Sequence, residues 1–290
     1  MEIGIHTGNF EDRCADRAAA LTSTYSSMHA AGFDCADLSA ICDIRGAYYT
    51  RPFEEAKLLA AEEREIAARE GIRIHQVHGP WPTDDTSAEK RREKLFYMER
   101  AIRLTPVFGA RYLIIHPDMP FGWDSEPDPA FAYETNMALF CALLPIAEEE
   151  GVILCIENMP MKAHAISRTD RMYEFVREVN HPNLGMCLDT GHANVFADDC
   201  GEAVRLIAPV LRTLHVHDNL GDRDSHLPPH AGTVNWESFT DALREVGFDG
   251  VLSIEACLPV TDIKDAGFAA SAKRMAEIAR RLADRASGCV

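Results

Sequence analysis

One segment of the chain concentrates side chains that can bind a metal ion. This segment, "LHVHDNLGDRDSHLPPHAGTVNW" at residues 214–236, holds four of the twelve histidines and three aspartates: His215, His217, His226, His230, Asp218, Asp222 and Asp224. Imidazole and carboxylate groups together bind divalent metals, although the same composition also keeps an ordinary loop soluble. The segment alone therefore leaves a metal site and a solvated loop both open.

The same side-chain types recur at the ends of strand-like apolar runs elsewhere in the chain. Seven runs end in an ionisable residue that can bind a metal: His6, His78, His116, Glu157, Asp189, His215 and Glu255. The preceding residues are apolar, as in "YLII" before His116 and "VILCI" before Glu157. A single histidine at a strand end is usually structural, but burying so many ionisable groups together is costly unless a cation compensates them. The joint pattern therefore predicts a divalent metal site.

The types of ligand limit the identity of the metal. Two glutamates, one aspartate and one histidine would form a site rich in hard oxygen ligands, which suits Mn²⁺, Mg²⁺ or Co²⁺. The addition of His78, His116 and His192 would shift the preference towards Zn²⁺ or towards a cluster of several ions. The metal and the number of ions therefore stay open.

The elements that would position these residues alternate regularly. Strand-like runs cover residues 2–7, 35–39, 72–79, 112–117, 152–158, 184–190, 213–218 and 250–256, and helical patterns lie between them. Two of these helical patterns end at Gly71 and Gly151, a residue type suited to a helix C-terminus. Eight strands alternating with eight helices, with no linker, predict a single (β/α)₈ TIM barrel over residues 1–290. All strand ends of a barrel converge on one rim, where active sites are built.

The alternative fold is an open, doubly wound α/β sheet. Such a sheet usually carries a glycine-rich phosphate-binding turn after its first strand. Here the first strand runs into "HTGNFEDR", which has no such glycine pattern. The barrel is therefore the favoured fold.

Composition limits the partners and the location. The net charge is −17, and no basic face of the kind that neutralises nucleic-acid phosphates is visible in the sequence, so we expect no nucleic-acid partner. No apolar run reaches membrane-spanning length and the N-terminus lacks a secretory signal, so we expect no membrane partner. The nine cysteines include no C-x-x-C pair, which favours reduced thiols and a cytoplasmic protein. Homo-oligomerisation stays open.

Four motifs carry a resemblance to a known superfamily. "CIEN", "CLDTGH", "LHVHDN" and "SIEA" resemble the xylose isomerase-like TIM barrels, which include sugar isomerases and epimerases, inosose and dehydroshikimate dehydratases, and endonuclease IV. The resemblance spans nearly the whole chain, and it implies the following central metal ligands: Glu157, Asp189, His215 and Glu255. It places His192 beside them. Endonuclease IV in particular implies further metal or substrate roles for four residues: His78, His116, Asp224 and His226.

The resemblance leaves the substrate open. All nine positions of the three-metal site of endonuclease IV have a counterpart, which makes DNA repair a serious alternative. The acidic charge and the lack of basic, aromatic-bearing loops argue against duplex DNA and favour a small sugar or polyol. Ketose 3-epimerases carry a second glutamate where this chain has Ala163, and an arginine where it has Gly221. The sugar, its phosphorylation and the type of reaction are therefore not fixed.

The activity that the resemblance implies is isomerisation or epimerisation of a sugar, sugar phosphate or cyclitol, through an enediolate that a divalent metal stabilises. Glu157 and Glu255 would act as acid and base, and His192 would bind the carbonyl oxygen. A dehydratase or lyase is the first alternative, and an apurinic-site nuclease is the second. Asp224 and His226 would complete a second metal position or hold a substrate hydroxyl. The remaining predicted substrate contacts are His6, His217, Trp81 and Trp123.

Overall fold

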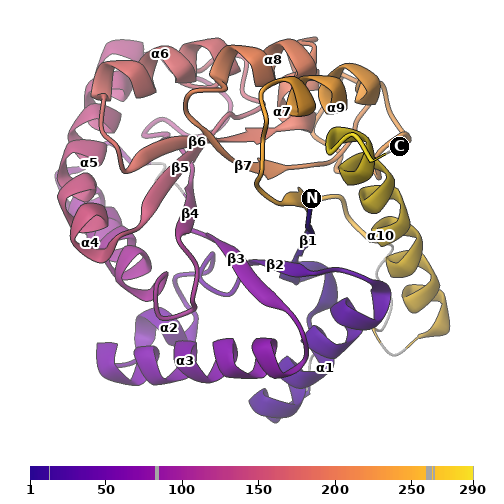
Figure 1. The fold of residues 1–290 in the computed structure, drawn as a ribbon. Helices are drawn as coiled ribbons and strands as arrows, with labels where there is room; N and C mark the ends of the chain where they lie inside the picture. Colours follow the sequence, from indigo (N-terminus) through magenta and orange to yellow (C-terminus); the bar gives the residue numbers. More distant parts are fainter. Residues whose placement is uncertain (13, 82–84, 259–262, 264, 290) are drawn as a thin grey trace.

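The described residues form a barrel of parallel strands. The computed structural model describes residues 1–12, 14–81, 85–258, 263 and 265–289. The strands are β1 (Ile3–His6), β2 (Cys35–Leu38), β3 (Arg73–His78), β4 (Tyr112–Ile115), β5 (Ile153–Glu157), β6 (Leu184–Asp189), β7 (Leu211–His215) and β8 (Leu252–Ile254). They pair in the order β7-β6-β5-β4-β3-β2-β1-β8, and a parallel bridge from Val216 to Ile254 joins the two remaining edges (Figure 1). The predicted TIM barrel is confirmed.

Helices surround the strands (Figure 1). The eight longer helices are α1 (Arg17–Ala31), α3 (Phe53–Arg69), α4 (Ala88–Leu104), α5 (Pro129–Glu150), α6 (Thr169–Val179), α8 (Cys200–Ile207), α9 (Trp236–Glu245) and α10 (Ala266–Ala286). Three short helices accompany them in the described part of the chain: η1 (Thr7–Phe10), α2 (Ala47–Thr50) and α7 (Thr190–Val195). The sequence pattern predicted one helix per connection and missed these short ones, because a single helical turn carries too few residues to show a period. Gly151 ends α5 in the left-handed conformation, as predicted.

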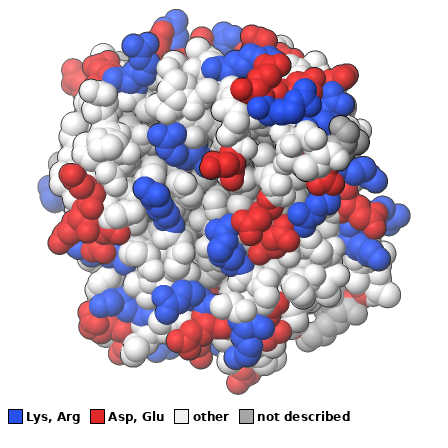
Figure 2. Space-filling view, viewed as in Figure 1, with Lys and Arg blue, Asp and Glu red and all other residues white. Residues whose placement is uncertain are grey.

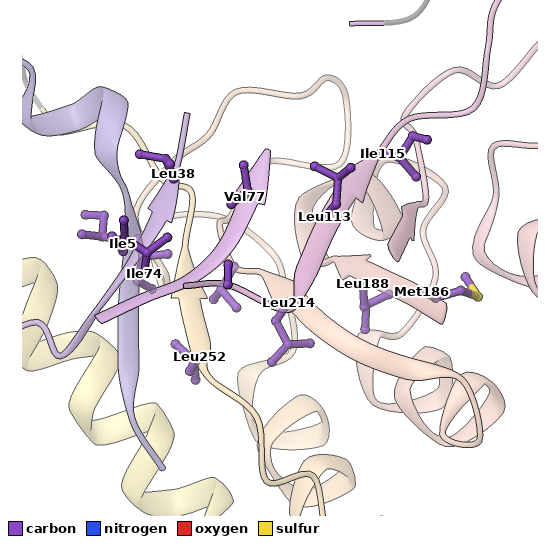
Figure 3. Packing of buried hydrophobic residues seen from close by; sticks show 14 of the residues in the cluster. Ile5, Leu38, Ile74, Val77, Leu113, Ile115, Met186, Leu188, Leu214 and Leu252 are labelled. Carbon is purple, nitrogen blue, oxygen red and sulfur yellow. The ribbon is translucent and has the colours of Figure 1, made fainter. Parts of the chain in front are cut away.

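Successive side chains of a strand point to opposite faces of the sheet, and this alternation determines which strand residues face the site. Leu154 and Ile156 of β5 pack in the main hydrophobic cluster, which extends over the strands from Ile5 on β1 to Leu252 on β8 (Figure 3). Cys155 belongs instead to a separate small cluster with Ile114 and Cys187 of the neighbouring strands. The residue two positions after Cys155 on the same face is Glu157, so an apolar layer lies directly before the ionisable strand ends.

Two irregularities interrupt the otherwise regular strand pairing. Between β2 and β3, Ala36 pairs with Ile74 and Asp37 pairs with Gln76, so the register shifts by one residue. A similar shift between Met186 and Cys187 separates the pairs of β6 with β7. Such bulges bend a strand and change the direction of the side chains that follow.

The sequence-based statement about membrane-spanning length is wrong for one helix. By length and composition α5 could cross a membrane, since it has 22 residues and a mean hydropathy of 1.4 in its most apolar window. In the fold, however, Leu139, Phe140 and Leu143 of α5 pack into the main hydrophobic cluster. Since 33% of that window is buried, packing on the barrel accounts for part of the apolar character of α5.

Candidate metal centre

Four of the strand-end residues meet at one point. Glu157, Asp189, His215 and Glu255 end or follow β5, β6, β7 and β8, and each offers a ligand atom within 4.8 Å of those of the others. His215 Nδ1 lies 2.9 Å from Glu157 Oε1 and 3.2 Å from Glu255 Oε2. Glu157, Asp189 and His215 are buried, whereas the Glu255 side chain keeps some exposure. The structure thus brings together the four residues predicted to hold a central metal.

His78 and His116 border this cluster on the side of β3 and β4. His116 Nε2 lies 3.2 Å from Glu157 Oε2, and His78 Nε2 lies 4.0 Å from the same oxygen. The His78 ring also stacks on the His215 ring, with centroids 5.5 Å apart. Both histidines are buried. A metal ion bound near Glu157 would therefore lie within reach of His78 and His116.

A second cluster lies beside the first and consists of His192, His217, Asp224 and His226, whose ligand atoms are again within 4.8 Å of one another. Asp224 Oδ2 is 3.2 Å from His192 Nε2 and 3.0 Å from His226 Nε2. The His217 ring stacks on that of His226, at 4.1 Å between centroids. The loop after β7 thus folds back onto the strand ends, and its Asp-x-His pair faces the site.

The backbone conformation explains how the loop after β7 folds back onto the strand ends. An antiparallel bridge joins Asp218 to Leu227, and His226 adopts a positive φ of 44°, which turns the chain sharply. His226 Nδ1 lies 3.0 Å from the carbonyl oxygen of Glu255, so the ring is tied to the end of β8 and Nε2 faces Asp224. Since a left-handed conformation costs free energy for histidine, the loop is held by these contacts rather than by backbone preference.

An aromatic wall stands at the mouth of the site. The Trp81 ring stacks on that of His116, with centroids 4.6 Å apart, and Trp123 lies 5.5 Å from Trp81. Both tryptophans are about half exposed although large and apolar. His6 lies deeper, with its ring edge-on to His78 at 6.0 Å. These positions allow substrate contact by three of the four predicted residues, namely His6, Trp81 and Trp123. Trp236, at the start of α9, is buried, and its Nε1 donates a hydrogen bond to Asp218 Oδ2.

Burial and neighbouring charges separate the histidines into two groups. Burial lowers the pKa of His6 and His78 to about 4, so both rings are neutral near pH 7 and carry a free lone pair. Burial also opposes a charge on His192, but the carboxylates of Asp189 and Asp224 raise the pKa of His192 to about 10. His192 therefore donates hydrogen bonds from a charged ring, whereas His78 is suited to be a ligand.

The surroundings shift the pKa values of Glu157 and Glu255 in opposite directions. Burial raises the pKa of Glu255 well above its usual value, with the negative charge of Glu157 adding to the effect. Burial also opposes the charge on Glu157, but His215 and His116 hold the pKa of Glu157 well below its usual value. Two carboxylates in one site with opposite shifts are typical of acid–base centres and of cation sites.

Two buried carboxylate oxygens indicate whether a cation fits this site. Glu255 Oε2 and Asp224 Oδ1 are buried. Histidine nitrogens lie near them, His215 Nδ1 at 3.2 Å and His217 Nε2 at 3.6 Å, but neither oxygen accepts a hydrogen bond from the described residues. A buried carboxylate oxygen without a partner is costly, and a cation would offset that cost. The oxygen-rich donor set with one or more neutral imidazoles matches the ligands that divalent ions prefer. The residues therefore fit a divalent metal ion.

Two further residues of the site were missed at the sequence level. Asp37 of β2 has its Oδ2 2.8 Å from His215 Nε2, and it lies inside a strand rather than at its end. Asn158 exchanges two hydrogen bonds with the backbone of Asp189, and its own carbonyl oxygen lies 2.7 Å from His192 Nδ1. The signal for Asp37 was a carboxylate within the apolar run "CADLS", and the signal for Asn158 was the amide that ends "CIEN".

A barrel of eight parallel strands, enclosed by helices and with its ionisable residues gathered at the strand ends, defines a TIM barrel of the kind that carries an active site on that rim. A sequence model of the xylose isomerase-like TIM barrel family matches residues 26–284. The chain belongs to this family.

Individual relatives carry two different activities in their names. D-psicose 3-epimerase of Agrobacterium fabrum is 24% identical over 230 residues, covering 77% of this chain and 75% of that protein. A probable endonuclease 4 of Mycoplasmopsis agalactiae is 22% identical over 194 residues, covering 60% and 66%. The family membership therefore includes both the sugar-acting and the nuclease alternatives.

Solved structures agree with the fold over almost the full chain. A D-psicose 3-epimerase crystallised in the presence of D-fructose has a TM-score of 0.77 and 20% identity, covering 97% of this chain and 99% of that one. The IOLI protein with a bound zinc atom has a TM-score of 0.73 and 15% identity, covering 100% and 99%. At these identities the likeness establishes the fold.

Proposed function

We propose that this protein is a divalent-metal-dependent isomerase or epimerase of a small sugar, sugar phosphate or cyclitol. The observation that carries the proposal is the meeting of Glu157 and Glu255 at His215 Nδ1, from strands β5 and β8. Two carboxylates on different strands can reach a bound substrate from different sides, which is what removal and return of a proton require. The similarity to proteins named D-psicose 3-epimerase supports a sugar as the substrate class.

The ligands that would hold a central metal are Glu157, Asp189, His215 and Glu255. The zinc atom bound in the related IOLI structure supports a metal in this position, and Mn²⁺, Mg²⁺, Co²⁺ and Zn²⁺ are all compatible with the donor types. The chemistry that such an ion supplies is Lewis acidity, which lowers the pKa of a C–H bond beside two chelated substrate oxygens.

The protein's own groups would move the proton. One of Glu157 and Glu255 takes the proton from the substrate carbon, and the other returns it. Return to the opposite face of the same carbon gives epimerisation, whereas return to the neighbouring carbon gives aldose–ketose isomerisation. The Asn158 carbonyl oxygen orients the His192 ring through Nδ1. His192 Nε2, now 3.2 Å from Asp224 Oδ2, would exchange that contact for a hydrogen bond to the substrate oxygen on which negative charge develops.

The rim would orient the sugar and exclude water. Trp81 and Trp123 present half-exposed rings, which can cover the apolar face of a sugar, and His6 and His217 line the inner part of the site. On the face that carries the chain termini, shown in Figure 2, acidic and basic side chains are interspersed. A cytoplasmic location and a homo-oligomer stay predictions.

A nuclease is the second candidate, because the second cluster of His192, His217, Asp224 and His226 assembles beside the first and a relative carries the name probable endonuclease 4. The discriminating experiment incubates the protein with Mn²⁺ and a panel of sugars and cyclitols in deuterated water, and in parallel with an abasic DNA duplex. An isomerase or epimerase gives an isobaric product with deuterium incorporated at carbon. A dehydratase gives a product that has lost water. Nicking of the duplex without any sugar turnover would contradict the proposal.

A further inference from the structure

Asp37 contacts the ring nitrogen of His215 that faces away from Glu157 and Glu255. Its Oδ2 lies 2.8 Å from Nε2 of His215, and both side chains are fully shielded from solvent. The other ring nitrogen of His215, Nδ1, faces Glu157 and Glu255 at 2.9 and 3.2 Å. The imidazole ring therefore stands between Asp37 on one edge and the carboxylate cluster on the other.

A residue of the neighbouring strand β3 holds the Asp37 carboxylate in place. The register shift between β2 and β3 places Asp37 opposite Gln76, and Gln76 Nε2 donates a hydrogen bond of 2.9 Å to Asp37 Oδ2. Asp37 Oδ1 is buried and accepts no hydrogen bond from the residues that the structure describes. His215 and Gln76 are thus the groups that stabilise this buried carboxylate, which would otherwise be costly to place inside the barrel.

We infer that Asp37 is a positioning residue that fixes the orientation and the protonated nitrogen of His215 for a divalent metal ion. With a metal ion at Nδ1, the remaining ring proton of His215 would be held on Nε2, because the ionised Asp37 carboxylate can only accept a hydrogen bond. The lone pair then lies on Nδ1 and faces Glu157 and Glu255. A carboxylate behind a ligating imidazole also makes the ligand more basic and more rigid. This inference rests on the proposed metal centre.

The test compares metal affinities on metal-free protein. Zn²⁺ is titrated against a competing chelator into the wild type, into Asp37→Asn, and into a control variant, Asp34→Asn. The control makes the same chemical change three residues earlier, where the carboxylate bonds Ile3 N and Arg280 instead of the site. We expect Asp37→Asn to weaken Zn²⁺ binding by about 10- to 100-fold, the scale seen when the partner of a metal-bound histidine is lost. We expect Asp34→Asn to bind Zn²⁺ as the wild type does.

A second measurement uses the wild type alone and so does not depend on the variant folding. In the ¹⁵N NMR spectrum of the Zn²⁺-loaded protein, His215 should carry its proton on Nε2, with Nδ1 unprotonated. A proton on Nδ1, or equal Zn²⁺ affinity of Asp37→Asn and the wild type, would overturn the inference while leaving the proposed function intact. Failure of the wild type to bind any metal would instead overturn both.

Discussion

Lys94 of α4 offers a prediction that links the stability of the fold to the mouth of the site. Its side chain is buried, and Nζ donates hydrogen bonds to the carbonyl oxygens of Pro80 and Trp81, at 3.1 Å in the case of Pro80. Trp81 in turn stacks on His116. Burial lowers the pKa of Lys94 from 10.5 to about 8, with only partial compensation by the negative charge of Asp118. The charged amine that holds this loop is therefore kept at a cost in stability.

The sign and size of that cost follow from linkage. Between pH 8 and 10.5 the unfolded chain binds a proton on Lys94 that the folded protein has lost, so stability rises with pH in this window. Below pH 8 both states are charged, and the folded state bears the full penalty. A lowering from 10.5 to about 8 corresponds to about 3 kcal/mol, because one pKa unit is worth about 1.4 kcal/mol. Most of this stability is recovered by about pH 10.

The perturbation is Lys94→Met, which removes the titrating group and keeps the length of the side chain. The melting temperature of the wild type relative to Lys94→Met should rise by about 5 °C between about pH 7 and pH 10, as expected for about 2–3 kcal/mol in a chain of this size. Lys90→Met is the matched control, since Lys90 lies on the same helix, is exposed and pairs with Glu93. Parallel pH profiles of the wild type and Lys94→Met would refute the reasoning.

Three further predictions concern the site itself. Glu157→Gln and Glu255→Gln should each lower turnover by about 10²-fold or more, measured with metal content on the same samples; full activity would remove that residue from the mechanism. His226→Ala should keep the fold and the central metal but lower kcat/KM by about ten- to a thousandfold, and unchanged kinetics would make its loop an ordinary one. The purified protein should carry about one to three divalent ions per chain by elemental analysis, and removal by a chelator should abolish activity until metal is restored.

The fold was predictable because each strand is a short apolar run with clear ends. The runs at 112–117 and 250–256 were drawn longer than β4 (Tyr112–Ile115) and β8 (Leu252–Ile254), because the ionisable residue that follows each strand was counted as part of it. The ionisable residue after each run was the stronger signal. His116 and Glu255 lie just beyond their strands and still reach the cluster, because all strand ends share one rim.

Asp37 and Asn158 were not predictable by the same reasoning. Asp37 meets His215 across the barrel. Four strands, β3 to β6, lie between β2 and β7 in the sheet order, so only closure of the barrel brings the two side chains together. The position of Asp37 also depends on the one-residue register shift between β2 and β3, which lies between the pairs Ala36–Ile74 and Asp37–Gln76. The sequence of a four-residue strand does not reveal such a shift. Asn158 acts through the backbone of Asp189, and spacing along the chain does not show such a contact.

Asp189 links the two clusters of ionisable residues, because it belongs to the first and contacts two members of the second. One of its oxygens accepts the backbone N–H of His192 and caps α7, while the other lies 2.9 Å from His217 Nε2. Asp189 also offers a ligand atom to the group around Glu157. If metal binds as proposed, an ion in the first cluster would act on the second through Asp189, and an ion in the second would occupy histidines that could otherwise contact a substrate. Measurement of the metal stoichiometry beside the substrate panel would therefore show whether one cluster or both are occupied by metal while a substrate is turned over.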